Sequence, residues 1–229
     1  MSDKTLKKRE YILNGNLLKV ILMITAPLAL YAIFNYLYGI IDLALVLPGE
    51  RAQVVFYDEM KTAITAFGAG IATAGSVIVG RLYGAGDIAN ARKNAGVTLW
   101  LNIIICTAIA VVVMAVAPFF FNVIKISDNI LDGISYFYVQ IITTIAMAVT
   151  ATFVGMEKVK GNTLLIFLLN IGAMVIKILL TILLVNVLHL RATFAAVSTL
   201  IAQVILMSVA LVLMFKKSNI LLANIKNLH

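Results

Sequence analysis

The sequence predicts an all-α integral membrane protein, a bundle of six transmembrane helices. Of its 229 residues, 62% are hydrophobic and 12% are charged, and the mean hydropathy is +1.06. One soluble domain of this size could not bury so much apolar surface. Apolar stretches of about 20 residues, the length that crosses a hydrocarbon core of about 30 Å, recur along the chain. The solvent around this chain is therefore predicted to be lipid.

Six apolar stretches define the predicted helices, at residues 17–47, 62–82, 97–124, 134–154, 163–188 and 192–215. The first follows a group of basic residues, as a signal peptide would. It is far longer than the 7–15 residues of a signal-peptide core, and no small-residue cleavage site follows, so it is kept as a helix. We expect a cytoplasmic segment at 1–16, a six-helix lobe at 17–215 and a cytoplasmic tail at 216–229.

The second helix contains the strongest local pattern, a series of small residues that includes Gly68, Gly70, Gly75, Gly80 and Gly84. Small residues at short spacing allow helix backbones to approach closely in lipid. The pattern therefore predicts a tightly packed neighbour. It is a poor nucleotide-binding motif, because it lies within a membrane span and follows no strand.

Catalytic and metal-binding patterns are missing from the sequence. Cys106, in the third helix, is the only cysteine, which excludes an intrachain disulfide and a zinc-binding cysteine cluster. The histidines His189 and His229 have no metal-ligand spacing, and there is neither a nucleophile elbow nor a phosphate-binding loop. We expect no enzyme activity and no cofactor. Without a phosphate-binding loop, the energy for any transport would come from an ion gradient.

The net charge of +8 is explained by topology rather than by a nucleic-acid partner. If the helices alternate in direction, thirteen lysines and arginines lie on the side of both termini and four on the other side. The positive-inside rule then places both termini in the cytoplasm. We expect the chain to lie in a plasma membrane, that of a bacterium. Attraction to anionic lipid in the bilayer is a secondary consequence.

Two charged residues lie deep within predicted spans. Asp42 is a lone carboxylate in the first helix, and five apolar residues follow it before Pro48. A charge in the hydrocarbon usually faces a bundle interior or a watery cavity, so Asp42 indicates an ion or substrate pathway; the alternative is an outer-end residue that reaches water. Lys177 is the only lysine deep within a span. It could pair with Asp42 or face a cavity, or it could extend towards water at the membrane surface.

Four segments in this order resemble the multidrug and toxic compound extrusion (MATE) transporters. They are NYLYGIID at 35–42, GRLYGAGD at 80–87, GNT at 161–163 and FAAVSTLIAQ at 194–203. The resemblance covers nearly the whole chain. It implies a twelve-helix exporter of two six-helix lobes, of which this chain matches the N-terminal lobe. Either the natural protein continues into a second lobe or two copies associate as a homodimer. The tail resembles the start of a connector between lobes, which favours the first option.

The resemblance also implies a coupling site for a proton or sodium ion. In the family, an aspartate equivalent to Asp42 works with a threonine early in the sixth helix, which matches Thr199. The family pattern on the fifth helix is not reproduced: one register places Lys177 and Thr181 at the expected positions, and a shifted register uses Asn170. If Lys177 pairs with Asp42, its ammonium occupies the place of a coupling cation, which disfavours sodium binding. Coupling of transport to a proton would remain possible, because burial can lower the pKa of a lysine.

A further set of polar and aromatic residues is predicted to line a cavity. Asn35 lies nearly two helical turns before Asp42 and so on a similar face. Aromatic rings could hold planar cations, although aromatic residues at membrane interfaces are a common alternative. The predicted lining residues are Asn35, Tyr31, Phe34, Tyr38 and Tyr138.

The sequence as a whole predicts one lobe of a secondary exporter that couples proton or sodium entry to efflux of small, drug-like, cationic organic compounds by alternating access. Its partners would be the lipid bilayer, the substrate and a second six-helix lobe. One alternative is a non-transporting membrane scaffold in which Asp42 and Lys177 form a structural pair. Another is a flippase for lipid-linked sugars, in which a cationic cavity would suit an anionic substrate.

Overall fold

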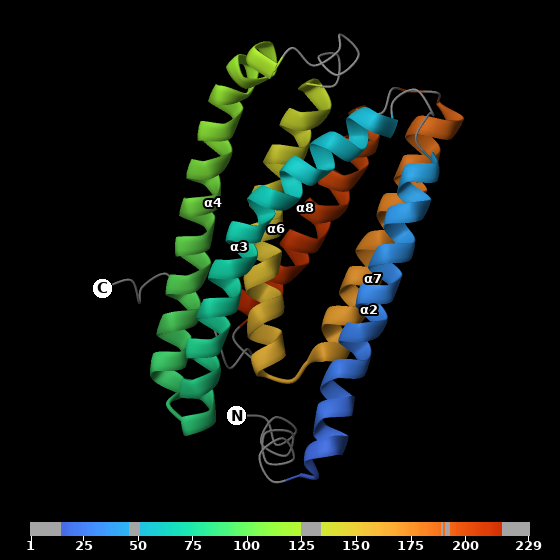
Figure 1. Ribbon diagram of the computed structural model, residues 1–229. Coiled ribbons are helices and arrows are strands. Elements are labelled where there is room, and N and C mark those ends of the chain that lie inside the picture. The colour runs from blue at the N-terminus through green and yellow to red at the C-terminus, as the bar shows by residue number, and fades with distance from the viewer. Residues whose placement is uncertain (1–14, 46–50, 125–133, 189, 191–192, 217–229) are drawn as a thin grey trace.

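The described part of the computed structural model, residues 15–45, 51–124, 134–188, 190 and 193–216, is helical, and no strand occurs within it (Figure 1). Six helices are long and apolar enough to cross a membrane, which confirms the predicted fold class. They are α2 (Leu17–Leu45), α3 (Arg51–Ala85), α4 (Ile88–Ile124), α6 (Ile134–Val159), α7 (Thr163–Thr181) with its π-helical continuation η2 (Ile182–Val187), and α8 (Thr193–Phe215).

Two helices begin earlier than the apolar stretches predicted. Helix α3 begins at Arg51 rather than at residue 62, and α4 begins at Ile88 rather than at residue 97. Both extensions interrupt the apolar pattern with charged residues: the first contains Asp58 and the second contains Arg92. A hydropathy criterion finds the part of a helix that lies in lipid, but the backbone hydrogen bonds of a helix continue beyond it. At 35 and 37 residues, α3 and α4 are each more than about 50 Å long.

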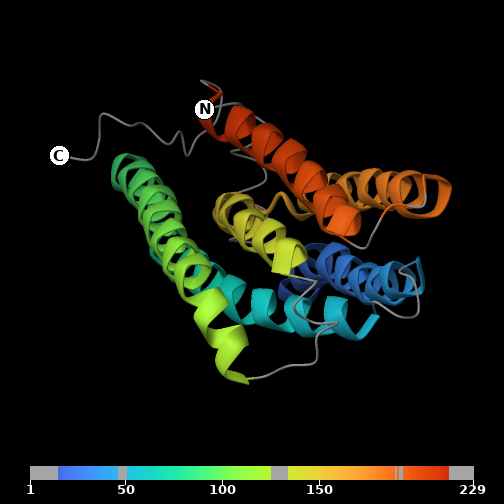
Figure 2. The ribbon, with the colours of Figure 1, turned by 90° about the horizontal axis from the view of Figure 1, so that it is seen from above.

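Helix α6 is the centre of the lobe and packs against α3, α4 and α8 (Figures 1 and 2). In α6, 67% of the span is buried, against 33% or less in each of the other spans. Helix α2 lies beside α7, and α7 in turn packs against α8. The lobe thus consists of a four-helix group and an α2–α7 pair, which are joined mainly through the contact between α7 and α8.

Aromatic rings pack together at the end of the lobe where α3 begins. Tyr57 of α3 and Phe121 of α4 meet edge to face with ring centroids 5.6 Å apart, and Phe121 meets Phe137 of α6 in the same way at 5.4 Å. Edge-to-face contacts place the positive edge of one ring on the negative face of another. Large apolar side chains such as Leu18, Phe119 and Val212 remain about 70% exposed, as expected for surfaces that contact lipid.

The small-residue pattern of α3 produces the close approach that it predicts, at Gly68 and Gly75. A Cβ atom added to Gly75 would lie 2.2 Å from Cγ2 of Thr98 on α4. One added to Gly68 would lie 3.0 Å from Sγ of Cys106, also on α4. Gly70 and Gly84 face open space. Only part of the glycine series is therefore used for helix packing.

Candidate functional site

A cavity of about 240 Å³ lies between α7 and the wall made by α3, α6 and α8. Its lining contains three of the residues predicted to form the coupling site: Asn170 and Lys177 on α7, and Thr199 on α8. These residues are far apart in the sequence and come together because α7 packs against α8. The remaining lining residues are Lys61, Thr62, Thr65, Met147, Ala173, Met174, Ala202 and Gln203.

Helical periodicity explains which side chains reach this cavity. On α7 the lining positions are 170, 173, 174 and 177, and on α8 they are 199, 202 and 203. Spacings of three and four residues bring side chains to the same face of a helix. Each of the two helices therefore presents one polar stripe to the cavity.

A second cavity, of about 410 Å³, shares five lining residues with the first, among them Asn170 and Gln203. It is lined mostly by apolar side chains, which include Leu28 of α2, Val154 of α6 and Leu206 of α8. The shared lining makes the two cavities neighbours within the lobe. The smaller cavity has a polar lining that includes Lys61 and Lys177, and the larger cavity is lined mainly by apolar side chains.

The polar side chains around the smaller cavity donate hydrogen bonds to the backbone of their own helices. Nδ2 of Asn170 donates to the Ile166 carbonyl at 2.8 Å, and Oγ1 of Thr199 donates to the Ala195 carbonyl at 3.1 Å. These bonds leave the amide oxygen of Asn170 and the lone pairs of the Thr199 hydroxyl as acceptors. The buried Oε1 of Gln203 has no hydrogen-bond partner among the described residues. The wall therefore offers oxygen atoms to a cation or to a donor group.

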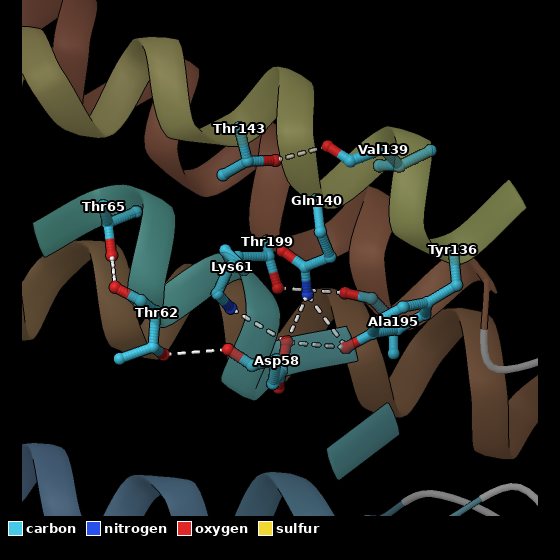
Figure 3. Close-up of polar contacts among 10 residues, drawn as sticks. All are labelled: Asp58, Lys61, Thr62, Thr65, Tyr136, Val139, Gln140, Thr143, Ala195 and Thr199. Atoms are coloured by element: carbon cyan, nitrogen blue, oxygen red, sulfur yellow. Dashed lines mark hydrogen bonds and ion pairs between the residues drawn. The ribbon is translucent and has the colours of Figure 1, made fainter. Parts of the chain in front are cut away.

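Beside this cavity, Asp58 forms a network that joins α3 to α6 (Figure 3). Its Oδ1 accepts hydrogen bonds from Nζ of Lys61 at 2.9 Å, from Nε2 of Gln140 at 2.9 Å and from Oη of Tyr136 at 3.2 Å. Nε2 of Gln140 also lies 2.8 Å from Oη of Tyr136. The other amide atom of Gln140, Oε1, is buried without a partner among the described residues. Lys61 thus connects the Asp58 network to the cavity wall.

The sequence identified neither Lys61 nor Asp58 as a site residue. The reason is the later start predicted for α3. With the helix beginning at Arg51, residues 58, 61, 62 and 65 fall on one helix face. The sequence signal that could have revealed this face is the spacing of three and four residues among the polar residues Asp58, Lys61, Thr62 and Thr65.

The other predicted site residues have different surroundings. Thr181 is fully buried at the junction of α7 and η2, and its hydroxyl has no partner among the described residues. Phe34 packs on Phe167 of α7 with ring centroids 6.3 Å apart. Tyr138 lies beside Phe137, with centroids 6.4 Å apart, and is not among the lining residues of the two cavities. The backbone of α2 is described, but the side chains of four predicted site residues on it lie outside the described part: Tyr31, Asn35, Tyr38 and Asp42.

A second charged cluster lies at the opposite end of the lobe, after α6. Glu157 forms an ion pair with Lys160, and Nδ2 of Asn162 donates to its other carboxylate oxygen at 2.8 Å. Both charged side chains are buried. Gly161, between Lys160 and Asn162, has a φ of 72°, a conformation that glycine adopts easily. This cluster stabilises the turn between α6 and α7.

Comparison with known families and structures adds an independent observation. The family model MatE matches residues 27–183. A structure of a multidrug resistance MATE family transporter of the MOP superfamily in an outward-facing conformation has a TM-score of 0.88 at 20% identity, covering 96% of this chain and 50% of that one. Comparison with curated protein sequences gave no match.

Two further solved structures are similar. A MATE structure in complex with MaD3S has a TM-score of 0.89 at 20% identity, covering 96% of this chain and 50% of that one. A MOP superfamily transporter from Pyrococcus furiosus, reported with a binding pocket of reverse polarity, has a TM-score of 0.84 at 21% identity, covering 91% and 47%. The chain therefore spans about half the length of these structures.

Proposed function

This chain belongs to the MatE family of membrane transporters, and we propose that it forms the ion-coupling lobe of a secondary exporter that works by alternating access. The observation that carries the proposal is the cavity inside the lobe, which collects Asn170, Lys177 and Thr199 from two helices. Helix α2, which carries Asp42, packs against α7, the helix of Asn170 and Lys177. This packing supports a site at which Asp42 and the cavity residues act together.

In the proposed site, Asp42 binds and releases the coupling ion, a proton or a sodium ion. Oxygen atoms of Asn170, Thr181 and Thr199 assist it, because hard cations prefer oxygen ligands. The acceptor capacity of Asn170 and Thr199 supports this role, as does the buried hydroxyl of Thr181, which has no partner within the described part of the chain. Lys177 competes with the ion for Asp42. A protonated lysine close to a carboxylate favours proton coupling over sodium coupling, because the ammonium replaces a free cation.

Transport also requires a second six-helix lobe. The chain covers about half of the solved transporters that it resembles. We propose that the second half is supplied either by further polypeptide or by another copy of this chain, and that the two lobes rock against each other about a shared substrate path. We propose that the lobe is oriented in the membrane with both termini in the cytoplasm, as the positive-inside rule predicts.

The decisive experiment is export from cells that lack other efflux pumps, measured with cationic and anionic fluorescent compounds. We expect Asp42→Asn to abolish export that depends on the ion gradient. Asp87→Asn is the matched control, because Asp87 lies in the turn between α3 and α4. Export by Asp42→Asn at the wild-type rate would refute the coupling role. A collapse of export when the proton gradient alone is dissipated would identify the coupling ion as a proton.

A further inference from the structure

Threonine side chains line the two neighbouring cavities, and the hydroxyl proton of each is already used in a hydrogen bond. Each Oγ1 donates to a backbone carbonyl three or four residues earlier in its own helix, at 2.6–3.1 Å. Figure 3 shows three of these bonds. A hydroxyl has a single proton, so these groups present only lone pairs to the cavities. The lining threonines are Thr62, Thr65, Thr144, Thr150 and Thr199.

Where the two cavities meet, three helices bring hydrogen-bond acceptors together. The lining that both cavities share includes Thr62 and Thr65 on α3, Asn170 on α7 and Gln203 on α8. Nδ2 of Asn170 donates to its own helix at 2.8 Å, and the amide oxygen is left as an acceptor. Oε1 of Gln203 is buried and accepts no hydrogen bond from the described residues. A buried acceptor of this kind costs free energy unless a ligand or water supplies a donor.

Hydrogen bonding, rather than net charge, distinguishes this junction. Lys61 is ion-paired with Asp58 at 2.9 Å, and Lys177 has an interaction of its own. Lys158 is exposed in the last turn of α6. Hydroxyl and amide oxygens accept a hydrogen bond from a neutral N–H group as well as from a charged one. The property that this wall can recognise is therefore the N–H donors that a ligand carries.

Beyond the junction, the larger cavity is suited to an apolar group. Its volume is about 410 Å³, and Leu28, Val154 and Leu206 line it. Cys106 also lines it, but the thiol donates to Oδ1 of Asn102 at 3.3 Å and so adds no free donor. Apolar walls with a few well-placed polar groups are typical of small-molecule sites.

We propose that the two cavities bind an amphipathic compound whose polar end carries N–H donors, as a primary amide or a primary amine does. The N–H groups bond to the oxygen atoms of Gln203, Thr62 and Thr65, and the apolar body lies in the larger cavity. The inference rests on the proposed transport function and names the substrate class of the same cavity. It differs from the cationic class predicted from the sequence, because a quaternary ammonium ion carries the charge without any N–H donor.

The test compares naphthylpropionamide with its N,N-dimethyl derivative, which keeps the carbonyl acceptor and the apolar body but has no N–H donor. Binding of the tritium-labelled probes is measured by scintillation proximity on the full chain in nanodiscs, with binding to empty nanodiscs subtracted. We expect the primary amide to bind at least about fivefold more tightly, because each hydrogen bond contributes a factor of about two to ten.

The preference should disappear in Thr65→Val/Gln203→Met, which removes two acceptors from the junction and keeps side chains of similar size. Thr73→Val is the matched control. Thr73 lies on the same helix as Thr65, is exposed outside both cavities, and donates the same kind of bond, to the Ala69 carbonyl at 2.8 Å. This variant should keep the preference. If the double variant does not fold, the single variant Gln203→Met replaces it, and its preference should fall at least about twofold.

Equal binding of the two probes, tighter binding of the dimethyl derivative, or no binding of either would overturn the proposal. So would a preference that survives in Thr65→Val/Gln203→Met, since the methyl groups would then be excluded by shape alone, or a preference that is lost in Thr73→Val. The proposed function fails separately. Selective binding of the amide together with export that is unchanged in Asp42→Asn refutes the coupling role alone, whereas Asp42-dependent export of both probes at equal rates refutes the donor selectivity alone.

Discussion

Two amides in the four-helix group, one on α4 and one on α8, show how differently two sides of this group use polar side chains. Nδ2 of Asn102 on α4 donates to the carbonyls of Gly68 and Ala148 and to the hydroxyl of Thr152, at 2.9–3.1 Å. Oε1 of Gln203 on α8 has no partner among the described residues and lies at the cavity. The first amide joins three helices, and the second leaves an acceptor open. We therefore assign the first amide to helix packing and regard the second as available to a ligand.

Helix spacing follows the same division. On the Asn102 side, Gly68 and Gly75 allow α4 to approach α3 so closely that an added Cβ would press on Cys106 or overlap Thr98. On the cavity side, the wall is built from larger and more flexible side chains, among them Met147 and Met174. Methionine adapts its shape to its neighbours, so such a wall can repack around different occupants. The close-packed Asn102 side holds the helices together, whereas the side chains on the cavity side can change conformation.

The largest expected effect is at Gly75. In Gly75→Ala the new Cβ would lie 2.2 Å from Cγ2 and 2.8 Å from Cβ of Thr98, so the α3–α4 contact must shift. Overpacking of this kind costs about 1–3 kcal/mol. Thermal unfolding in detergent, followed with a thiol-reactive dye on the buried Cys106, should show a lower midpoint. Gly70→Ala is the control, because Gly70 faces open space and alanine favours helix by up to about 1 kcal/mol. Equal midpoints would contradict the close-packing assignment.

The next effect separates the two amides. Asn102→Leu removes contacts to α3 and α6, and hydrogen bonds between membrane helices contribute about 0.6 kcal/mol each and up to about 1.7 kcal/mol. We expect a lower free energy of unfolding, measured by titration with a denaturing detergent. Gln203→Leu removes a carbonyl that accepts no hydrogen bond from the residues that the structure describes, and it should be neutral or stabilising. If the two substitutions lower the free energy of unfolding equally, the proposed difference between the Asn102 side and the cavity side is refuted.

The sequence predicted the fold well because membrane spans are determined by simple physics. Long apolar runs must become helices in lipid, and all six were located. The starts of α3 and α4 were missed because charged and amide side chains, such as Asp58 and Arg92, separate the first residues of each helix from its apolar run. That error also concealed Lys61, whose place on the cavity wall depends on where α3 begins.

The candidate site was predictable only in part. Thr199, Asn170 and Lys177 were identified from the family resemblance and from intramembrane charge, and the structure places all three on one cavity. Spacing along a single helix cannot reveal which helices face each other. The meeting of α3 with α6 through Asp58 and Gln140 depends on packing between distant segments, so no local pattern could have indicated it.

The smallest effect is expected outside both regions, at the turn between α3 and α4, and it measures the contribution of a solvent-exposed helix cap. Hydrogen bonds from the side chain and the backbone of Asn90 lower the pKa of Asp87 from its usual value of 3.8. A lowered pKa in the folded state stabilises the fold above pH 3.8, and this contribution is lost as the pH falls through the lower, folded-state pKa. Asp87→Ala should therefore reduce the unfolding midpoint slightly at pH 7, and the difference from wild type should shrink towards pH 3 by differential scanning fluorimetry. Asn94→Ala, one turn further along α4, should show no such pH dependence. A difference that stays constant with pH would mean that the Asp87 charge does not contribute to the cap.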